Sequence, residues 1–153
     1  MKVQYINPFL ESASTVIQQF CNVSVTQGEV VQRELTFHVD HTWIRIGMTG
    51  QFEGDVIFGL HNEVALKIVS AMMGGFPVSE MDEMGKSAIS ELGNMISGNA
   101  STLLYNQGMT IDITPPEIVQ NYEMFSSKGS EALSVPLNLS EMGRMEIQVI
   151  VAK

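Results

Sequence analysis

The chain has 153 residues, of which 44% are hydrophobic and 16% charged, and these proportions suit one globular domain spanning residues 1–153. Its net charge of −9 argues against nucleic acid or an anionic membrane as a partner, because no cluster of Lys and Arg is present to neutralise phosphates. No apolar run approaches the ~20 residues that span a bilayer and the N-terminus lacks the apolar stretch of a signal peptide, so we expect a cytoplasmic protein.

The first part of the chain combines one helix with several strands. Asn7-Pro8 has the form of an N-cap followed by proline at the first helical position, and the apolar spacing that follows predicts a helix over residues 8–20. Alternating apolar residues then predict four strands, at 23–25, 30–39, 43–48 and 56–60.

The second part contains two helices and a further group of strands. A helix is predicted over 63–73, where Gly74-Gly75 ends it, and Ser79 is expected to cap a longer helix that extends to Tyr105. The remaining strands are predicted at 111–113, 117–119, 132–139 and 145–151. Because helices and strands are mixed without regular βαβ alternation, the pattern indicates an α+β fold, with an antiparallel or mixed sheet covered on one face by long helices.

An acid and an amide lie one turn apart on the long helix. At about 100° and 1.5 Å per residue, Ser87, Glu91 and Asn94 fall within roughly 60° of one another. The predicted core side is apolar and consists of Met81, Ala88, Leu92, Met95, Ile96 and Leu103. Glu91 and Asn94 should therefore project toward solvent or a partner, although such a pair by its spacing alone is most often an ordinary solvated face.

The surrounding sequence is more specific than this spacing. It contains Met72-Met73-Gly74-Gly75 and, from residue 91 to residue 100, Glu-Leu-Gly-Asn-Met-Ile-Ser-Gly-Asn-Ala. This text closely resembles the CheX group of the CheC/CheX/FliY family, the CheY-P phosphatases of bacterial chemotaxis. The family signature is Asp or Ser, three residues, Glu, two residues and Asn, which Ser87, Glu91 and Asn94 match, and the resemblance extends over nearly the whole chain.

A weak internal repeat agrees with this resemblance. Asn7, Glu11 and Ser14 have the same spacing as the signature and also lie opposite the apolar stripe of their helix. Family members of the CheC type have two such sites on pseudo-symmetric helices, whereas the CheX type keeps only the second. Ser14 in place of an asparagine thus makes the chain CheX-like, and a CheC/CheX-like fold with internal pseudo-symmetry is implied.

The resemblance implies an enzyme that stimulates hydrolysis of the aspartyl phosphate on a CheY-like response-regulator receiver. The receiver would supply magnesium, a lysine and the phosphorylated aspartate, so no cofactor of the chain's own is expected. A carboxamide such as Asn94 can both donate to and accept from a water, and so hold it in line with phosphorus. Glu91 is suited to pair with the receiver lysine. Ser87 either supports Glu91 by a hydrogen bond or is a polar surface residue.

Further expectations concern assembly and other residues near the signature. CheX relatives pair through their sheets, so a homodimer is expected. Gly93 is expected either to let the partner approach the helix backbone or to be neutrally tolerated. Asn99 is expected near the apolar side, where it would satisfy buried backbone groups.

His38 and His41 are expected on opposite faces of an extended segment, which disfavours a metal site.

Two alternatives to the enzyme remain open. The main one is a non-catalytic receiver-binding module in two-component signalling, which the retention of both Glu91 and Asn94 disfavours because docking alone needs no water-orienting amide. The other is a component of the flagellar switch, because FliY-type proteins share the domain.

Overall fold

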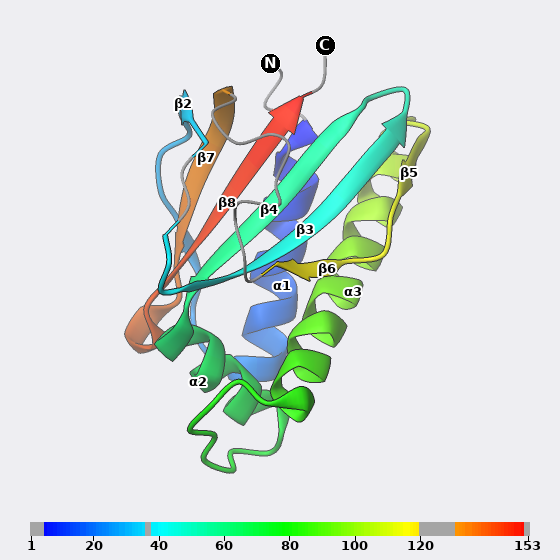
Figure 1. Cartoon of the computed structure of the whole chain (residues 1–153). Helices are drawn as coiled ribbons and strands as arrows, with labels where there is room; N and C mark the ends of the chain where they lie inside the picture. The colour runs from blue at the N-terminus through cyan, green and yellow to red at the C-terminus, as the bar shows by residue number, and fades with distance from the viewer. Residues whose placement is uncertain (1–4, 36–37, 120–130, 152–153) are drawn as a thin grey trace.

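Three helices cover one face of an antiparallel sheet in the computed structural model, which describes residues 5–35, 38–119 and 131–151 (Figure 1). Within these residues the sheet has eight strands in the order β1-β7-β8-β4-β3-β5, while β2 pairs with β7 and β6 pairs with β3. The α+β class, the antiparallel sheet and the helical cover predicted from the sequence are confirmed.

The elements have the following bounds. The helices are α1 (Asn7–Cys21), α2 (Asn62–Met72) and α3 (Glu83–Asn106). The strands are β1 (Thr26–Gln27), β2 (Val31–Glu34), β3 (His41–Gly50), β4 (Gly54–His61), β5 (Ile111–Ile113), β6 (Glu117–Val119), β7 (Glu131–Asn138) and β8 (Arg144–Val151). None of the described helices is long and apolar enough to cross a membrane.

The main core lies between the sheet and the helices. Strand β3 contributes Ile44, Ile46 and Met48, and the same cluster contains Phe9 of α1 and Ile96 of α3. These side chains are at most 2% exposed, and full burial of such a side chain contributes about 1.5–3 kcal/mol to folding. Because α1 and α3 pack on each other as well as on the sheet, the position of α3 is fixed along most of its length.

A second, smaller cluster lies on the other face of the sheet and is centred on Trp43. Trp43 of β3 is paired with Gly59 of β4, and a Cβ at Gly59 would lie only 2.3 Å from the indole ring. The ring thus occupies the space that a side chain at position 59 would need. Both faces of the central strands are buried as a result. This burial explains why the sequences of these strands are nearly continuous apolar runs.

The structure corrects three local predictions. Residues 23–25 form no strand, because the pairing with β7 begins only at Thr26. Asn7 is the first residue of α1 rather than its N-cap, and the preceding Ile6 makes no side-chain cap. The cap of α3 is Asp82 rather than Ser79, because the helix begins only at Glu83, and the carboxylate of Asp82 accepts from the backbone N–H of Gly85 at 2.9 Å.

Candidate functional site

The exposed face of α3 contains all three signature residues. Ser87, Glu91 and Asn94 are each exposed, as their spacing predicted. Across the described part of the chain, neither Glu91 nor Asn94 has a hydrogen-bond or ion-pair partner, and Ser87 makes no hydrogen bond to Glu91. The acid and the amide are therefore presented together, one turn apart, with their polar atoms available to another molecule.

The buried face of α3 lies directly opposite Glu91. It consists of Gly85, Ile89, Leu92, Gly93, Ile96, Ser97, Ala100 and Leu104. The predicted core stripe was correct at Leu92 and Ile96, whereas Ala88, Met95 and Leu103 are only partly buried. The stripe is displaced because small residues face the interior and let α3 pack closely against its neighbours.

Gly93 belongs to this inner face, so its predicted role in approach by a partner was wrong. A Cβ at Gly93 would lie 2.8 Å from Cβ of Pro116 and 3.2 Å from Cγ2 of Ile44. The missing side chain makes room for the segment before β6 and for β3. The angular position of Gly93, about 200° beyond Glu91 around the helix, is a signal in the sequence for this inward orientation.

Gly98 lies on the outer face of α3, unlike Gly93, and the sequence pattern gave no expectation for it. It is exposed, and a Cβ built there would meet nothing within 4 Å. Around the helix it lies about 20° from Glu91, one turn beyond Asn94. A glycine inside a helix costs about 1 kcal/mol relative to alanine, and the described residues give Gly98 no packing that would compensate for this cost. Because Gly98 has no side chain, the helix backbone beside Glu91 and Asn94 is left uncovered.

Asn99 was also misplaced by the sequence pattern. It is exposed, and hence does not satisfy buried backbone groups as predicted. The buried polar residue in this part of α3 is its neighbour Ser97, at 8% exposure.

His41 and His61 both contact Asp40, and the ring of His38 lies beside that of His41, contrary to the expectation for His38 and His41. The rings of His38 and His41 are 4.8 Å apart, because residues 39 and 40 form a turn before β3 begins. Nδ1 of His41 lies 2.9 Å from Asp40 and Nε2 of His61 lies 3.1 Å from it. The hydrogen bond with His41 is the main cause of a lowered pKa at Asp40.

This histidine cluster has a structural use at the start of α2. Nδ1 of His61 accepts from the backbone N–H of Glu63 at 3.1 Å and so caps the helix. In the described residues, no group of three or more His, Cys, Asp or Glu side chains is arranged to hold a metal ion.

The first copy of the repeat lies on α1, which packs beside α3. Asn7 and Glu11 are exposed, whereas Ser14 is half-buried. The acid is thus presented as on α3, but Ser14 stands at the position that corresponds to the amide of Asn94.

Comparison with known proteins identifies close relatives. The family model for the chemotaxis phosphatase CheX matches residues 43–138. The CheY-P phosphatase CheX of Thermotoga maritima is 42% identical over 142 residues, covering 91% of this chain and 90% of that protein. The CheX of a CheX-CheY-BeF3-Mg complex from Borrelia burgdorferi is 29% identical with a TM-score of 0.79, covering 99% of this chain and 100% of the other. A CheC-like superfamily protein from Shewanella sp. PV-4 has 25% identity and a TM-score of 0.80, with full coverage of both chains.

Proposed function

The chain belongs to the CheX family of chemotaxis phosphatases, and we propose that it stimulates hydrolysis of the aspartyl phosphate on a CheY-like receiver. In this proposal α3 docks against the receiver and inserts Glu91 and Asn94 into its phosphorylation site. The observation that carries the proposal is the unpartnered acid and amide, one turn apart on the exposed face of α3.

Asn94 positions the attacking water. An amide is not a base near neutral pH, but its oxygen accepts a hydrogen bond while its nitrogen donates one. It can therefore hold a water in line with phosphorus without taking up its proton. The phosphoryl transition state needs little covalent help, so positioning of this kind provides much of the acceleration.

Glu91 fixes the register of α3 in the receiver. Its carboxylate pairs with the lysine of the receiver site, a charge-assisted contact that is strengthened when docking excludes water. With Glu91 held, Asn94 is placed about 4.5 Å further along the helix axis.

In this proposal magnesium is supplied by the receiver, and the mechanism requires no cofactor bound to the chain itself. The relative from Borrelia burgdorferi was crystallised as a complex with CheY, BeF3 and Mg, which supports this division of the site between two proteins. The metal neutralises charge on the phosphoryl oxygens, while Glu91 and Asn94 contribute orientation.

The test is phosphate release from phosphorylated CheY-type receivers of the same organism, with and without the protein. We expect release from at least one receiver to accelerate in proportion to the protein added. A receiver that binds the protein but loses phosphate at its intrinsic rate would favour the alternative of a non-catalytic docking module.

We further propose that the protein acts in the cytoplasm as a two-fold homodimer whose interface lies on the sheet, away from α3. Strand β2 supports this proposal, because it lies at an edge of the sheet and Val31 is 46% exposed. Light scattering at micromolar concentration should give twice the mass of one chain. A stable monomer would remove the dimer and leave the catalytic proposal untouched.

A further inference from the structure

Seven of the exposed residues of α3 form one stripe that is longer than the signature, while the exposed Glu83, Asn99 and Asn106 lie outside it. Helical geometry places the seven within about 80° of one another around the axis. They are Met84, Ser87, Glu91, Asn94, Gly98, Thr102 and Tyr105, all exposed. A large apolar side chain stands at each end, Met84 at 63% exposure and Tyr105 at 79%.

We propose that Met84 and Tyr105 are apolar anchors for the receiver and that Gly98 is the point where the receiver meets the helix backbone. This inference rests on the proposed function and extends it from the reacting residues to the surface that selects the partner. The molecule that binds this stripe is a receiver whose surface has an apolar patch on each side of its phosphorylation site.

Half of the exposed large apolar side chains in the described residues lie at the two ends of this helix. Six large hydrophobic side chains are exposed in the described residues, and three of them, Phe76, Met84 and Tyr105, lie at these ends. Exposed apolar residues that stand singly need no explanation, whereas aromatic and Met side chains gathered beside a reactive pair are typical of interface anchors.

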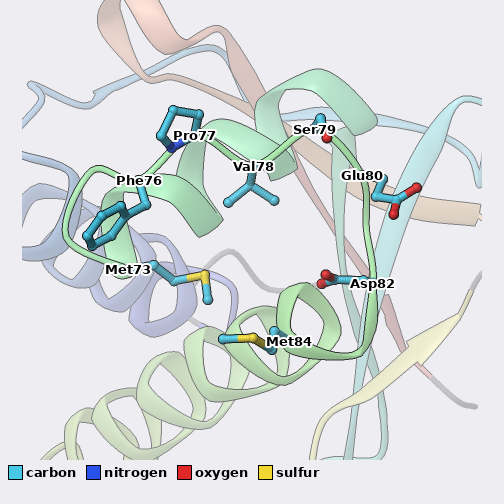
Figure 2. Close-up of a pocket in the computed structure, with 8 residues that line it drawn as sticks. All are labelled: Met73, Phe76, Pro77, Val78, Ser79, Glu80, Asp82 and Met84. Atoms are coloured by element: carbon cyan, nitrogen blue, oxygen red, sulfur yellow. The ribbon is translucent and has the colours of Figure 1, made fainter.

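A pocket lies beside Met84, at one end of the stripe. It has a volume of about 610 Å³ and lies between the end of α2 and the start of α3, and Figure 2 shows Met73, Val78 and Met84 facing it with Phe76 at its edge. Glu80 and Asp82 also line it, and Figure 2 shows the carboxylate of Asp82 pointing toward the pocket, so the receiver patch that enters it should be apolar with a basic border on this side. Because Met84 belongs to both the pocket and the stripe, the pocket continues the face that presents Glu91.

The length of the stripe fits one receiver domain. Met84 and Tyr105 are separated by about 30 Å along the axis, with Glu91 and Asn94 between them. A standard interface buries about 800 Å² on each partner, which corresponds to a patch of about the same width. A partner centred on the acid and amide thus reaches both anchors.

Small residues flank the reactive pair inside the stripe. Ser87 precedes Glu91 by about one turn and Gly98 follows Asn94 by about one turn, where nothing else fills the space. Long side chains at these positions would hold the receiver away from the helix. Their absence lets Glu91 and Asn94 reach beyond the surface around them.

The experiment measures binding and turnover separately for single variants. Affinity is titrated with a CheY-type receiver activated by beryllofluoride and Mg²⁺, and turnover is measured as phosphate release from the phosphorylated receiver. Met84→Ala and Tyr105→Ala should each raise Kd and KM about tenfold with kcat unchanged. Phe20→Ala on α1, which also removes an exposed aromatic ring (42% exposed), should leave both constants unchanged and serves as the matched control.

Gly98→Ala separates docking from folding. Alanine improves helix propensity, so the Tm should rise, while the added methyl group should raise Kd about tenfold or more. A merely structural glycine would not combine a gain in stability with a loss of affinity.

The outcomes distinguish this inference from the proposed function. If the native protein accelerates phosphate release but Met84→Ala, Tyr105→Ala and Gly98→Ala all bind like the native protein, the anchors are wrong and the phosphatase proposal stands. If Met84→Ala or Tyr105→Ala changes the mass in light scattering but not Kd, the occupant of the stripe is a second copy and the inference is overturned. If the native protein neither binds nor dephosphorylates any receiver, both proposals fail.

Discussion

Helices α1 and α3 display the same spacing of polar residues on the same side of the sheet, yet they differ in what they offer a partner. On α3 the acid Glu91 is followed by the exposed amide Asn94, whereas on α1 the acid Glu11 is followed by the half-buried Ser14. One turn further, α3 has the bare backbone of Gly98 and α1 has the exposed side chain of Gln18.

Exposure of an acid on a helix is therefore not sufficient for the proposed chemistry. A water has to be held by a group that both donates and accepts with fixed direction, and the partner needs room to approach. Among the described helices, only α3 has an exposed amide three residues after an exposed acid, so the activity is expected on α3.

The largest effect is expected from Asn94→Ala. Receiver-stimulated phosphate release should fall by about 10²-fold or more, because a positioning group is lost, while Kd for the activated receiver should remain nearly native. Phosphate release and receiver titration measure the two quantities. Release at the native rate would show that the amide does not position the water and would favour the docking module.

Glu91→Ala should weaken binding and turnover together, by about tenfold or more, because the proposed ion pair fixes α3 in the receiver. The effect on Kd should shrink as salt is raised, since screening already weakens the native contact. Glu11→Ala on α1 is the matched control and should leave both quantities unchanged. Equal losses from Glu91→Ala and Glu11→Ala would contradict the assignment of the site to α3.

Gly93→Ala tests the inner face of α3 against its outer face. The new methyl group would meet Pro116 and Ile44, and overpacking costs about 1–3 kcal/mol, of which better helix propensity offsets about 1 kcal/mol. The free energy of unfolding should therefore fall by up to about 2 kcal/mol in urea denaturation. Gly98→Ala should instead raise the free energy of unfolding. An increase in this free energy for both variants would show that Pro116 can shift to accommodate the methyl group at position 93.

The smallest effect is expected from Ser14→Ala. It removes a half-buried hydroxyl from the first copy of the repeat, so turnover and affinity should stay within about twofold of native. Phosphate release measures this change. A loss comparable to that of Asn94→Ala would mean that α1 also contacts the receiver.

Much of the site could be predicted from the sequence because it lies on one regular helix. The relative directions of Glu91 and Asn94 depend only on the helical repeat, and the residues opposite them had to be buried. The predicted face was therefore correct, although the core stripe at Ala88 and Met95 was displaced. Periodicity treats glycine and serine as neutral, whereas packing placed Gly93 and Ser97 in the interior.

The three helices, most of the strands, the α+β class and the orientation of the signature could be predicted from the sequence, because these depend on local periodicity and residue chemistry. The assembled fold shows what fills the space at Gly93, since Pro116 and Ile44 are distant from it in sequence, and it shows that nothing fills the space at Gly98. It also brought His61 to His41 and Asp40 through the pairing of β3 with β4. Contacts between segments far apart in the chain leave no local pattern, so they become visible only when the sheet and helices are assembled.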